Sequence, residues 1–178
     1  MAIAYLLLAI RQSIWCWFCA AVSSGIYIYL FIGARLYMES GLNLYYFLMA
    51  AYGWIVWNDV ARDGDVRPVV SWPLHWHLAA IAAIVAVSAL SGTLLNQFTD
   101  AALPFIDSLT TWGALWATFL VARKVFENWW YWLAIDAVSV WIYWTRDLEL
   151  TSVLFFIYVL MIPFGMLAWR RSMQADVG

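Results

Sequence analysis

The chain is a succession of apolar runs, each about long enough to cross a lipid bilayer, separated by short breaks that hold most of its charges. Breaking the sequence at charged residues, Pro and Gly gives the runs 15–33, 41–57, 73–95, 103–122, 128–144 and 150–169. A membrane-spanning helix needs about 20 largely apolar residues. The pattern therefore predicts an all-α integral membrane protein.

Composition excludes a soluble domain of this size. Of the 178 residues, 66% are hydrophobic and only 11% are charged, which leaves too little polar surface to face water. No basic stripe indicates nucleic-acid binding, and no P-loop, HExxH or GxSxG motif indicates an enzyme. Cys16 and Cys19, and likewise His75 and His77, lack the spacing of a zinc site. We therefore expect no catalytic activity, metal or cofactor.

Basic residues predict the orientation, provided that the apolar opening stretch 1–10 is counted as part of a spanning helix. Alternation then gives seven crossings, with a strong excess of basic residues on one side. Basic residues favour the cytoplasmic side, so we expect the N-terminus outside and the C-terminus in the cytoplasm. The cytoplasmic group is Arg11, Arg62, Arg67, Arg123, Lys124, Arg170 and Arg171, against Arg35 and Arg146 outside.

An internal repeat appears when the chain is shifted by 112 residues. Residues 11–57 then align without a gap with 123–169, and ten of the 47 pairs are identical. Because one linker helix separates two copies of three helices, both copies cross the membrane in the same direction. The sequence predicts a SWEET-like 3+1+3 bundle with two parallel three-helix repeats. The identical pairs include Trp17 with Trp129, Gly53 with Gly165, and Trp57 with Trp169.

The repeat sets the expected organisation of the chain. Residues 1–57 form the first repeat, 58–102 a cytoplasmic loop with the linker helix, 103–169 the second repeat, and 170–178 a cytoplasmic tail. The fifth helix begins near Leu103, whose counterpart would lie before Met1. We therefore expect the first helix to be truncated, through a misplaced start codon or a real loss.

The run 127–144 carries the polar groups that membrane depth makes most costly. Asn128, Trp132 and Asp136 recur every four residues and so share one helix face. A carboxylate at the centre of a span needs a cation or a hydrogen-bond donor, and all Lys and Arg residues lie near helix ends. We expect Asp136 to meet a cationic ligand beside aromatic rings; the alternative is a structural hydrogen bond to a neighbouring helix.

Other candidates lie in the third and last helices. Asn43, Trp54 and Trp57 recur at helical spacing, although Asn43 could equally serve as a hydrogen bond between helices. Tyr158 in the last helix is a weaker candidate, since an aromatic residue there is more often part of the packing.

The motifs together resemble the PnuC family of bacterial nicotinamide riboside transporters. They are SIWCW (13–17), ARLY (34–37), YGWIVW (52–57), LPFIDS (103–108), ARKVFENWWYWLAID (122–136) and G-x-x-x-W (165–169). The resemblance implies uptake across the bacterial plasma membrane by facilitated diffusion, with retention when a cytoplasmic kinase phosphorylates the riboside. It also allows a homo-oligomer. The substrate-binding residues that it implies are Asn43, Trp54, Trp57, Asn128, Trp132, Asp136 and Tyr158.

Three positions depart from the family pattern. Asn43 stands where Gln is expected, and Phe18 and Ser24 stand where Pro and Asn are common. Related transporters carry thiamine or riboflavin, so these departures leave the vitamin open. Two further alternatives are an intramembrane enzyme that uses Asp136 as an acid or base, and a membrane subunit that does not transport.

Overall fold

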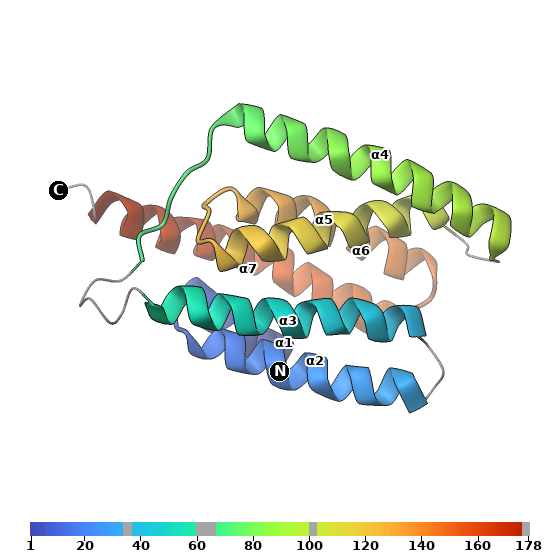
Figure 1. Ribbon diagram of the computed structural model, residues 1–178, viewed down its shortest axis with the longest axis horizontal. Helices are drawn as coiled ribbons and strands as arrows, with labels where there is room; N and C mark the ends of the chain where they lie inside the picture. The colour runs from blue at the N-terminus through green and yellow to red at the C-terminus, as the bar shows by residue number, and fades with distance from the viewer. Residues whose placement is uncertain (34–36, 60–66, 100–102, 176–178) are drawn as a thin grey trace.

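The computed structural model describes residues 1–33, 37–59, 67–99 and 103–175, without the side chains of residues 37–39 and 59. Arg35 and Arg62, and most of the ARLY motif, fall outside these residues. The described part is almost entirely helical, which confirms the predicted fold class (Figure 1). Its helices are α1 Ala2–Ile10, α2 Trp15–Gly33, α3 Tyr37–Asp59, α4 Leu74–Phe98, α5 Pro104–Ala122, α6 Asn128–Thr145 and α7 Glu149–Ala175.

Four helices are long and apolar enough to cross a membrane, namely α2, α4, α5 and α7. Helices α3 and α6 have similar lengths, 23 and 18 residues, but their Asn, Asp and Tyr side chains lower the hydropathy. Helix α1 has 9 residues, about half of a span. The chain is thus a multi-pass membrane protein, while the full set of seven crossings stays a prediction.

The helices outside α4 close into a ring. Within each half, α1 packs on α2 and α2 on α3, and likewise α5 packs on α6 and α6 on α7. The halves join through α3 against α5 and through α7 against α1. Helix α4 lies outside the ring, against α5, and forms one edge of the molecule in Figure 1.

Both halves use a glycine to seat a tryptophan. A β-carbon at Gly53 would lie 2.3 Å from the Trp17 ring, and one at Gly165 would lie 2.3 Å from the Trp129 ring. A helix can approach a large ring this closely only where it has no side chain. The pairs are related by the predicted offset of 112 residues.

The same offset relates the turns that follow α1 and α5. Gln12 and Lys124 both have φ of 53°, the left-handed conformation that ends each helix. Lys124 Nζ also donates a hydrogen bond to Gln12 Oε1 at 3.1 Å, so the two turns meet. The predicted repeat therefore reappears as equivalent local geometry.

The segment before α4 is attached to the turn between α5 and α6. The Val70 N–H donates to the Lys124 carbonyl at 3.0 Å, and the Phe126 N–H donates to the Val70 carbonyl at 2.8 Å. Glu127 accepts hydrogen bonds from Ser71 Oγ and from the Trp72 N–H. These contacts fix where the linker helix begins.

Helix α7 continues to Ala175, so the predicted tail 170–178 begins as a continuation of the last helix. Its sequence RRSMQA contains neither Pro nor Gly, and Arg, Met, Gln and Ala favour helix. Pro163 lies within α7, which membrane helices tolerate when neighbouring groups satisfy the freed carbonyl.

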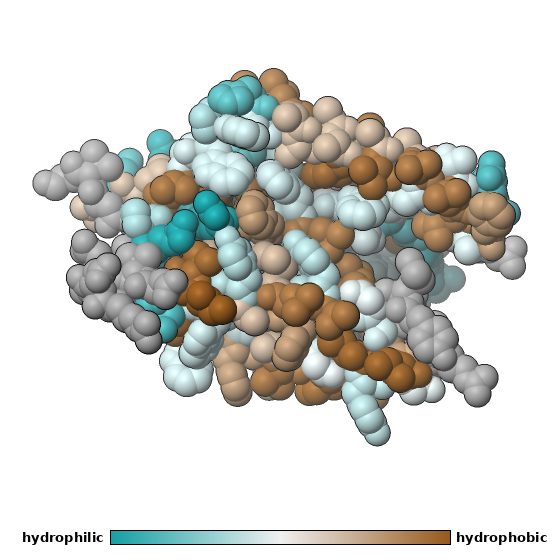
Figure 2. All heavy atoms as spheres, viewed as in Figure 1, coloured by the Kyte–Doolittle hydropathy of each residue, from teal (hydrophilic) through white to brown (hydrophobic). Residues whose placement is uncertain are grey.

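The surface is apolar over much of its area. Figure 2 shows hydrophobic residues across the middle of one face, with the most hydrophilic ones toward its two ends. Such a surface needs a lipid environment. One end, here called the basic end, is where α1, α3, α5 and α7 finish or pass and where α2 and α6 begin. Its described basic residues are Arg11, Arg67, Arg123, Lys124, Arg170 and Arg171.

Candidate functional site

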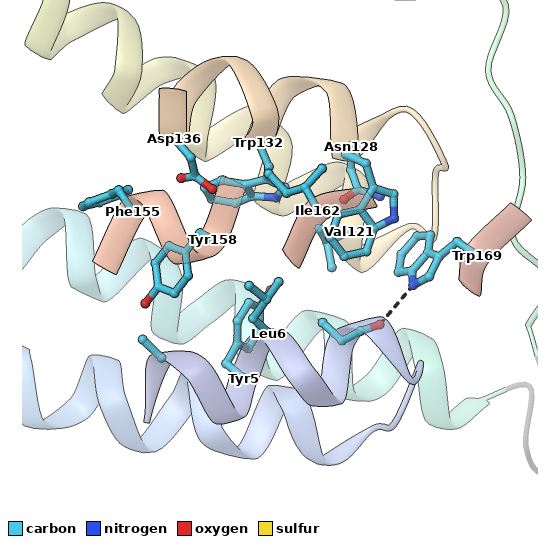
Figure 3. Close-up of a pocket in the computed structure, with 13 residues that line it drawn as sticks. Tyr5, Leu6, Val121, Asn128, Trp132, Asp136, Phe155, Tyr158, Ile162 and Trp169 are labelled. Carbon is cyan, nitrogen blue, oxygen red and sulfur yellow. Dashed lines mark hydrogen bonds between the residues drawn. The ribbon is translucent and has the colours of Figure 1, made fainter. Parts of the chain in front are cut away.

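A cavity of about 190 Å³ lies between α1, α6 and α7, and we call it the aspartate cavity. Helices α6 and α7 belong to the second repeat, whereas α1 belongs to the first, so both repeats line the cavity. Figure 3 shows side chains reaching into it from these helices. Its lining residues are Ala2, Tyr5, Leu6, Ala9, Val121, Asn128, Trp129, Trp132, Asp136, Phe155, Tyr158, Ile162 and Trp169.

One face of α6 supplies the polar side of the cavity. Asn128, Trp132 and Asp136 follow one another at intervals of one helical turn and all line it, as their spacing predicts. Asp136 is 5% exposed and Asn128 is fully buried. Across from them, Tyr5 and Leu6 project from α1 (Figure 3).

Among the residues that the structure describes, three polar groups of the cavity find no hydrogen-bond partner. The Asp136 carboxyl makes no hydrogen bond or ion pair to the residues that the structure describes. Asn128 Nδ2 donates to the Val125 carbonyl at 2.6 Å. The buried Asn128 Oδ1 and the Tyr158 hydroxyl have no hydrogen-bond partner in the described structure. Buried polar groups are usually hydrogen-bonded, so unpaired ones in a hollow are suited to a ligand.

Aromatic rings make up much of the remaining wall. Phe155 and Tyr158 stand edge to face with centroids 5.7 Å apart, and Trp132 and Trp169 line the same space. Rings bind flat ligands by stacking and attract cations through their negative faces. The cavity therefore combines an acidic group with surfaces for a flat or positively charged ring.

The first-repeat candidates do not line the aspartate cavity. Asn43 is half-buried, and Trp54 makes an edge contact with Trp15, their centroids 5.7 Å apart. Trp57 is buried and donates its indole N–H to the Ala122 carbonyl at 3.1 Å. Of the seven predicted residues, the structure thus brings four together: Asn128, Trp132, Asp136 and Tyr158.

The repeat explains part of this division. Phe155 and Trp169, which line the cavity, stand 112 residues after Asn43 and Trp57. The first-repeat residues thus hold the equivalent positions in the other half of the ring. Applying the repeat to Asn43 would have pointed to Phe155, which the sequence reasoning missed.

Tyr5 and Leu6 were missed for a different reason. They lie on a helix of nine residues, and nothing in their apolar stretch distinguishes a cavity wall from a lipid-facing or packed surface. Only the contact of α1 with α7 shows which space they face.

A second hollow of about 440 Å³ lies between α4, α5 and α6, and its lining is mostly apolar. The polar groups at its edge lie against one another, with His77 Nε2 3.7 Å from a Glu127 carboxylate oxygen. His77 Nδ1 lies 3.1 Å from the Tyr131 hydroxyl, and Glu127 accepts hydrogen bonds from the segment before α4. In the described part of the chain, no group of His, Cys, Asp and Glu is placed to hold a metal ion. The aspartate cavity is therefore the better candidate site.

Comparison with known proteins assigns the family. The family described as nicotinamide mononucleotide transporter matches residues 1–171. The chain belongs to this family. This confirms the resemblance seen in the motifs.

Transporters named for different substrates are among the relatives of this chain. The chain is 28% identical to the riboflavin/roseoflavin transporter RibM of Streptomyces davaonensis, covering 96% of this chain and 81% of RibM. It is 23% identical to the nicotinamide riboside transporter PnuC of Escherichia coli, covering 80% of this chain and 70% of PnuC.

A solved structure supports the fold. The crystal structure of the vitamin B3 transporter PnuC superposes with a TM-score of 0.71 at 19% identity, covering 96% of this chain and 77% of that one. The likeness extends over nearly all of the bundle described above.

Proposed function

We propose that this protein takes up nicotinamide riboside and that the aspartate cavity binds it. The observation that carries the proposal is the unpaired carboxyl of Asp136, buried in a cavity walled by aromatic rings. The pyridinium ring of nicotinamide riboside is flat and positively charged. It would supply the positive partner that the Asp136 carboxylate needs, and a flat face on which the aromatic rings can stack.

The other unpaired groups fit the rest of such a ligand. Asn128 Oδ1 is an acceptor, and the Tyr158 hydroxyl can donate or accept. A carboxamide and ribose hydroxyls offer the complementary donors and acceptors. The first-repeat candidates lie outside the aspartate cavity, and we propose that they approach the substrate when the repeats move. They are Asn43, Trp54 and Trp57.

Riboflavin is the second candidate, because RibM is more similar to this chain in sequence than E. coli PnuC is. Its ring system is flat but uncharged, so it would use the aromatic walls and not the carboxylate. Thiamine carries a positive charge on an aromatic ring, and Asp136 does not distinguish it from nicotinamide riboside.

Transport would be facilitated diffusion, with retention when a cytoplasmic kinase phosphorylates the riboside. The C-terminus would face the cytoplasm, since the basic end favours that side. An enzymatic role finds less support. An acid–base mechanism needs a second ionisable group beside Asp136, and Asp107 on the neighbouring helix α5 lies outside the cavity and pairs with Arg146 at 3.3 Å.

Uptake of labelled substrate tests the proposal. Cells that lack their own transporters and express this chain are given nicotinamide riboside, riboflavin or thiamine in separate experiments. A cytoplasmic nicotinamide riboside kinase is present in one strain and absent in another. We expect uptake of the riboside. When the membrane potential, which by itself accumulates a cation, is collapsed with an ionophore, the riboside should exceed its external concentration only when the kinase is present.

Riboflavin uptake without riboside uptake would show that riboflavin, the second candidate, is the substrate. Uptake of thiamine alone would retain a cationic substrate but change its identity. Accumulation above the external concentration without a kinase and without a membrane potential would contradict facilitated diffusion. No uptake of any of the three would contradict the proposed substrate class.

A further inference from the structure

Two tryptophans from opposite repeats meet where the aspartate cavity ends. Trp169 lines the cavity, and its indole N–H donates to the Ala9 carbonyl of α1 at 3.0 Å (Figure 3). Trp57 lies against it, with ring centroids 6.4 Å apart. The Trp57 N–H donates to the Ala122 carbonyl of α5 at 3.1 Å. Each indole thus bonds to the repeat to which it does not belong.

Within its own repeat, each of these two tryptophans packs against a second tryptophan. Trp17 and Trp57 stand edge to face with centroids 5.5 Å apart, and Trp129 and Trp169 do the same at 5.5 Å. Trp17 and Trp129 are the rings seated on glycine. Each repeat therefore carries a packed pair of rings that can move as one body.

Few polar contacts join the two bodies at this end. Among the described residues they include the two indole hydrogen bonds, the hydrogen bond from Lys124 Nζ to Gln12 Oε1, and the hydrogen bond from Arg123 Nη1 to the Tyr52 hydroxyl at 3.1 Å. Lys124 Nζ also lies 4.8 Å from the centre of the Trp57 ring. We call these contacts, with the Trp57–Trp169 ring contact, the tryptophan seam.

We propose that the tryptophan seam is the gate through which the substrate leaves the aspartate cavity at the basic end. The inference rests on the proposed function, because a gate needs a transported ligand. Trp169 is both wall of the cavity and member of the seam, and Trp57, Trp169 and Lys124 are all buried. Separating the repeats at this end would break the seam and the stacking of Tyr52 on Phe119, and it would leave the tryptophan pairs within each repeat intact.

The four tryptophans offer a matched test. Trp57→Phe keeps an aromatic ring but removes an N–H that bonds across the seam. Trp17→Phe makes the same change in its edge-to-face partner, whose indole N–H is buried without a hydrogen bond in the described structure. Neither residue lines the aspartate cavity. A hydrogen bond between membrane helices stabilises by about 0.6 kcal/mol on average, a factor of about threefold.

Opening is measured by thiol labelling, which needs no substrate. Cys16 and Cys19 are replaced by Ser, and Ile162→Cys places a buried reporter in the cavity wall. Inside-out vesicles are treated with a charged, membrane-impermeant methanethiosulfonate. We expect Trp57→Phe to speed labelling about threefold over its parent and Trp17→Phe to leave the rate unchanged. Equal rates in all three proteins, or equal increases in both variants, would overturn the gate.

Locking the seam gives a second measurement that does not depend on those variants. Gln12→Cys and Lys124→Cys, in the same background, are joined by a short bis-methanethiosulfonate linker. We expect the link to stop labelling of the Ile162→Cys reporter and substrate uptake, and a reductant to restore both. A link that forms and leaves both rates unchanged would contradict the proposal.

The two proposals fail in different ways. Absence of riboside uptake by the unmodified protein would contradict the proposed substrate. The labelling experiment would still test the gate, because it needs no substrate. If uptake is normal but neither Trp57→Phe nor the link changes the labelling rate, the gate is contradicted and the proposed substrate is kept.

Discussion

At the scale of single residues, Asp136 is the group whose position most needs explaining. It is buried on an apolar helix without an ion pair in the described structure, an arrangement that membrane proteins avoid unless the residue functions. The aromatic side chain one turn before it, Trp132, shares its cavity. Both could be predicted from the sequence, because a period of four residues fixes a common helix face whatever the neighbours are.

Replacing Trp132 by Ala should lower substrate uptake by about five- to thirtyfold. The change removes an aromatic face that stacks on a flat ring or attracts its charge, a contribution of roughly 1–2 kcal/mol when the site is dry. Initial uptake rates, corrected for the amount of protein in the membrane, provide the measurement. Trp141→Ala on the same helix is the control, since Trp141 is 53% exposed, and an equal loss there would contradict the assignment.

Gly53 and Gly165 should tolerate no side chain. Gly53→Ala and Gly165→Ala would each place a methyl group against a tryptophan ring, and overpacking of this kind costs about 1–3 kcal/mol. Thermal unfolding of the purified protein should show a lower Tm for both. Gly41→Ala is the control, because a β-carbon there meets nothing within 4 Å. An unchanged Tm in the first two variants would show that the rings move aside easily.

At the scale of elements, the helices could be predicted well and their attachments could not. The apolar runs end within a few residues of the observed helices, since charged residues and Pro mark the boundaries. The contacts of Glu127 with Ser71 and Trp72 join segments that are distant in sequence. No local sequence pattern predicts such a contact, because it depends on how the helices pack around the ring that they form.

Glu127→Ala should loosen the start of α4. Its carboxylate holds the Trp72 N–H at 3.2 Å and also Ser71 Oγ, and loss of one hydrogen bond costs about 1 kcal/mol. Hydrogen exchange followed by mass spectrometry should therefore show an amide at Trp72 that exchanges about fivefold faster. Glu149→Ala, at an exposed carboxylate, should leave this segment unchanged. Equal protection in both variants would mean that α4 is held by its apolar contacts alone.

At the scale of the whole molecule, the repeat is what the sequence reveals best. The offset of 112 residues reappears in glycine–tryptophan contacts, in turns and in the order of helix packing. Two features break the symmetry: α4 packs on the α5 side of the ring, and α1 is much shorter than α5. The aspartate cavity lies beside the short helix, so its walls could not be found by applying the repeat alone.

The C-terminus should face the cytoplasm. All described basic residues except Arg146 gather at the end of the bundle where α7 finishes, and cytoplasmic ends attract Lys and Arg. Green fluorescent protein fused after Gly178 should fluoresce, because it folds in the cytoplasm. An active alkaline phosphatase at the same point would require the opposite orientation.

Equilibrium binding to the purified protein tests the central claim, that Asp136 binds a positively charged aromatic ligand. Titration calorimetry would compare nicotinamide riboside with its uncharged dihydropyridine form, using the unmodified protein, Asp136→Asn, and Asp147→Asn at an exposed turn as control. We expect the unmodified protein and Asp147→Asn to prefer the cation by roughly thirtyfold or more, as for a buried charge pair, and Asp136→Asn to lose that preference. An equal preference in all three proteins would contradict the account.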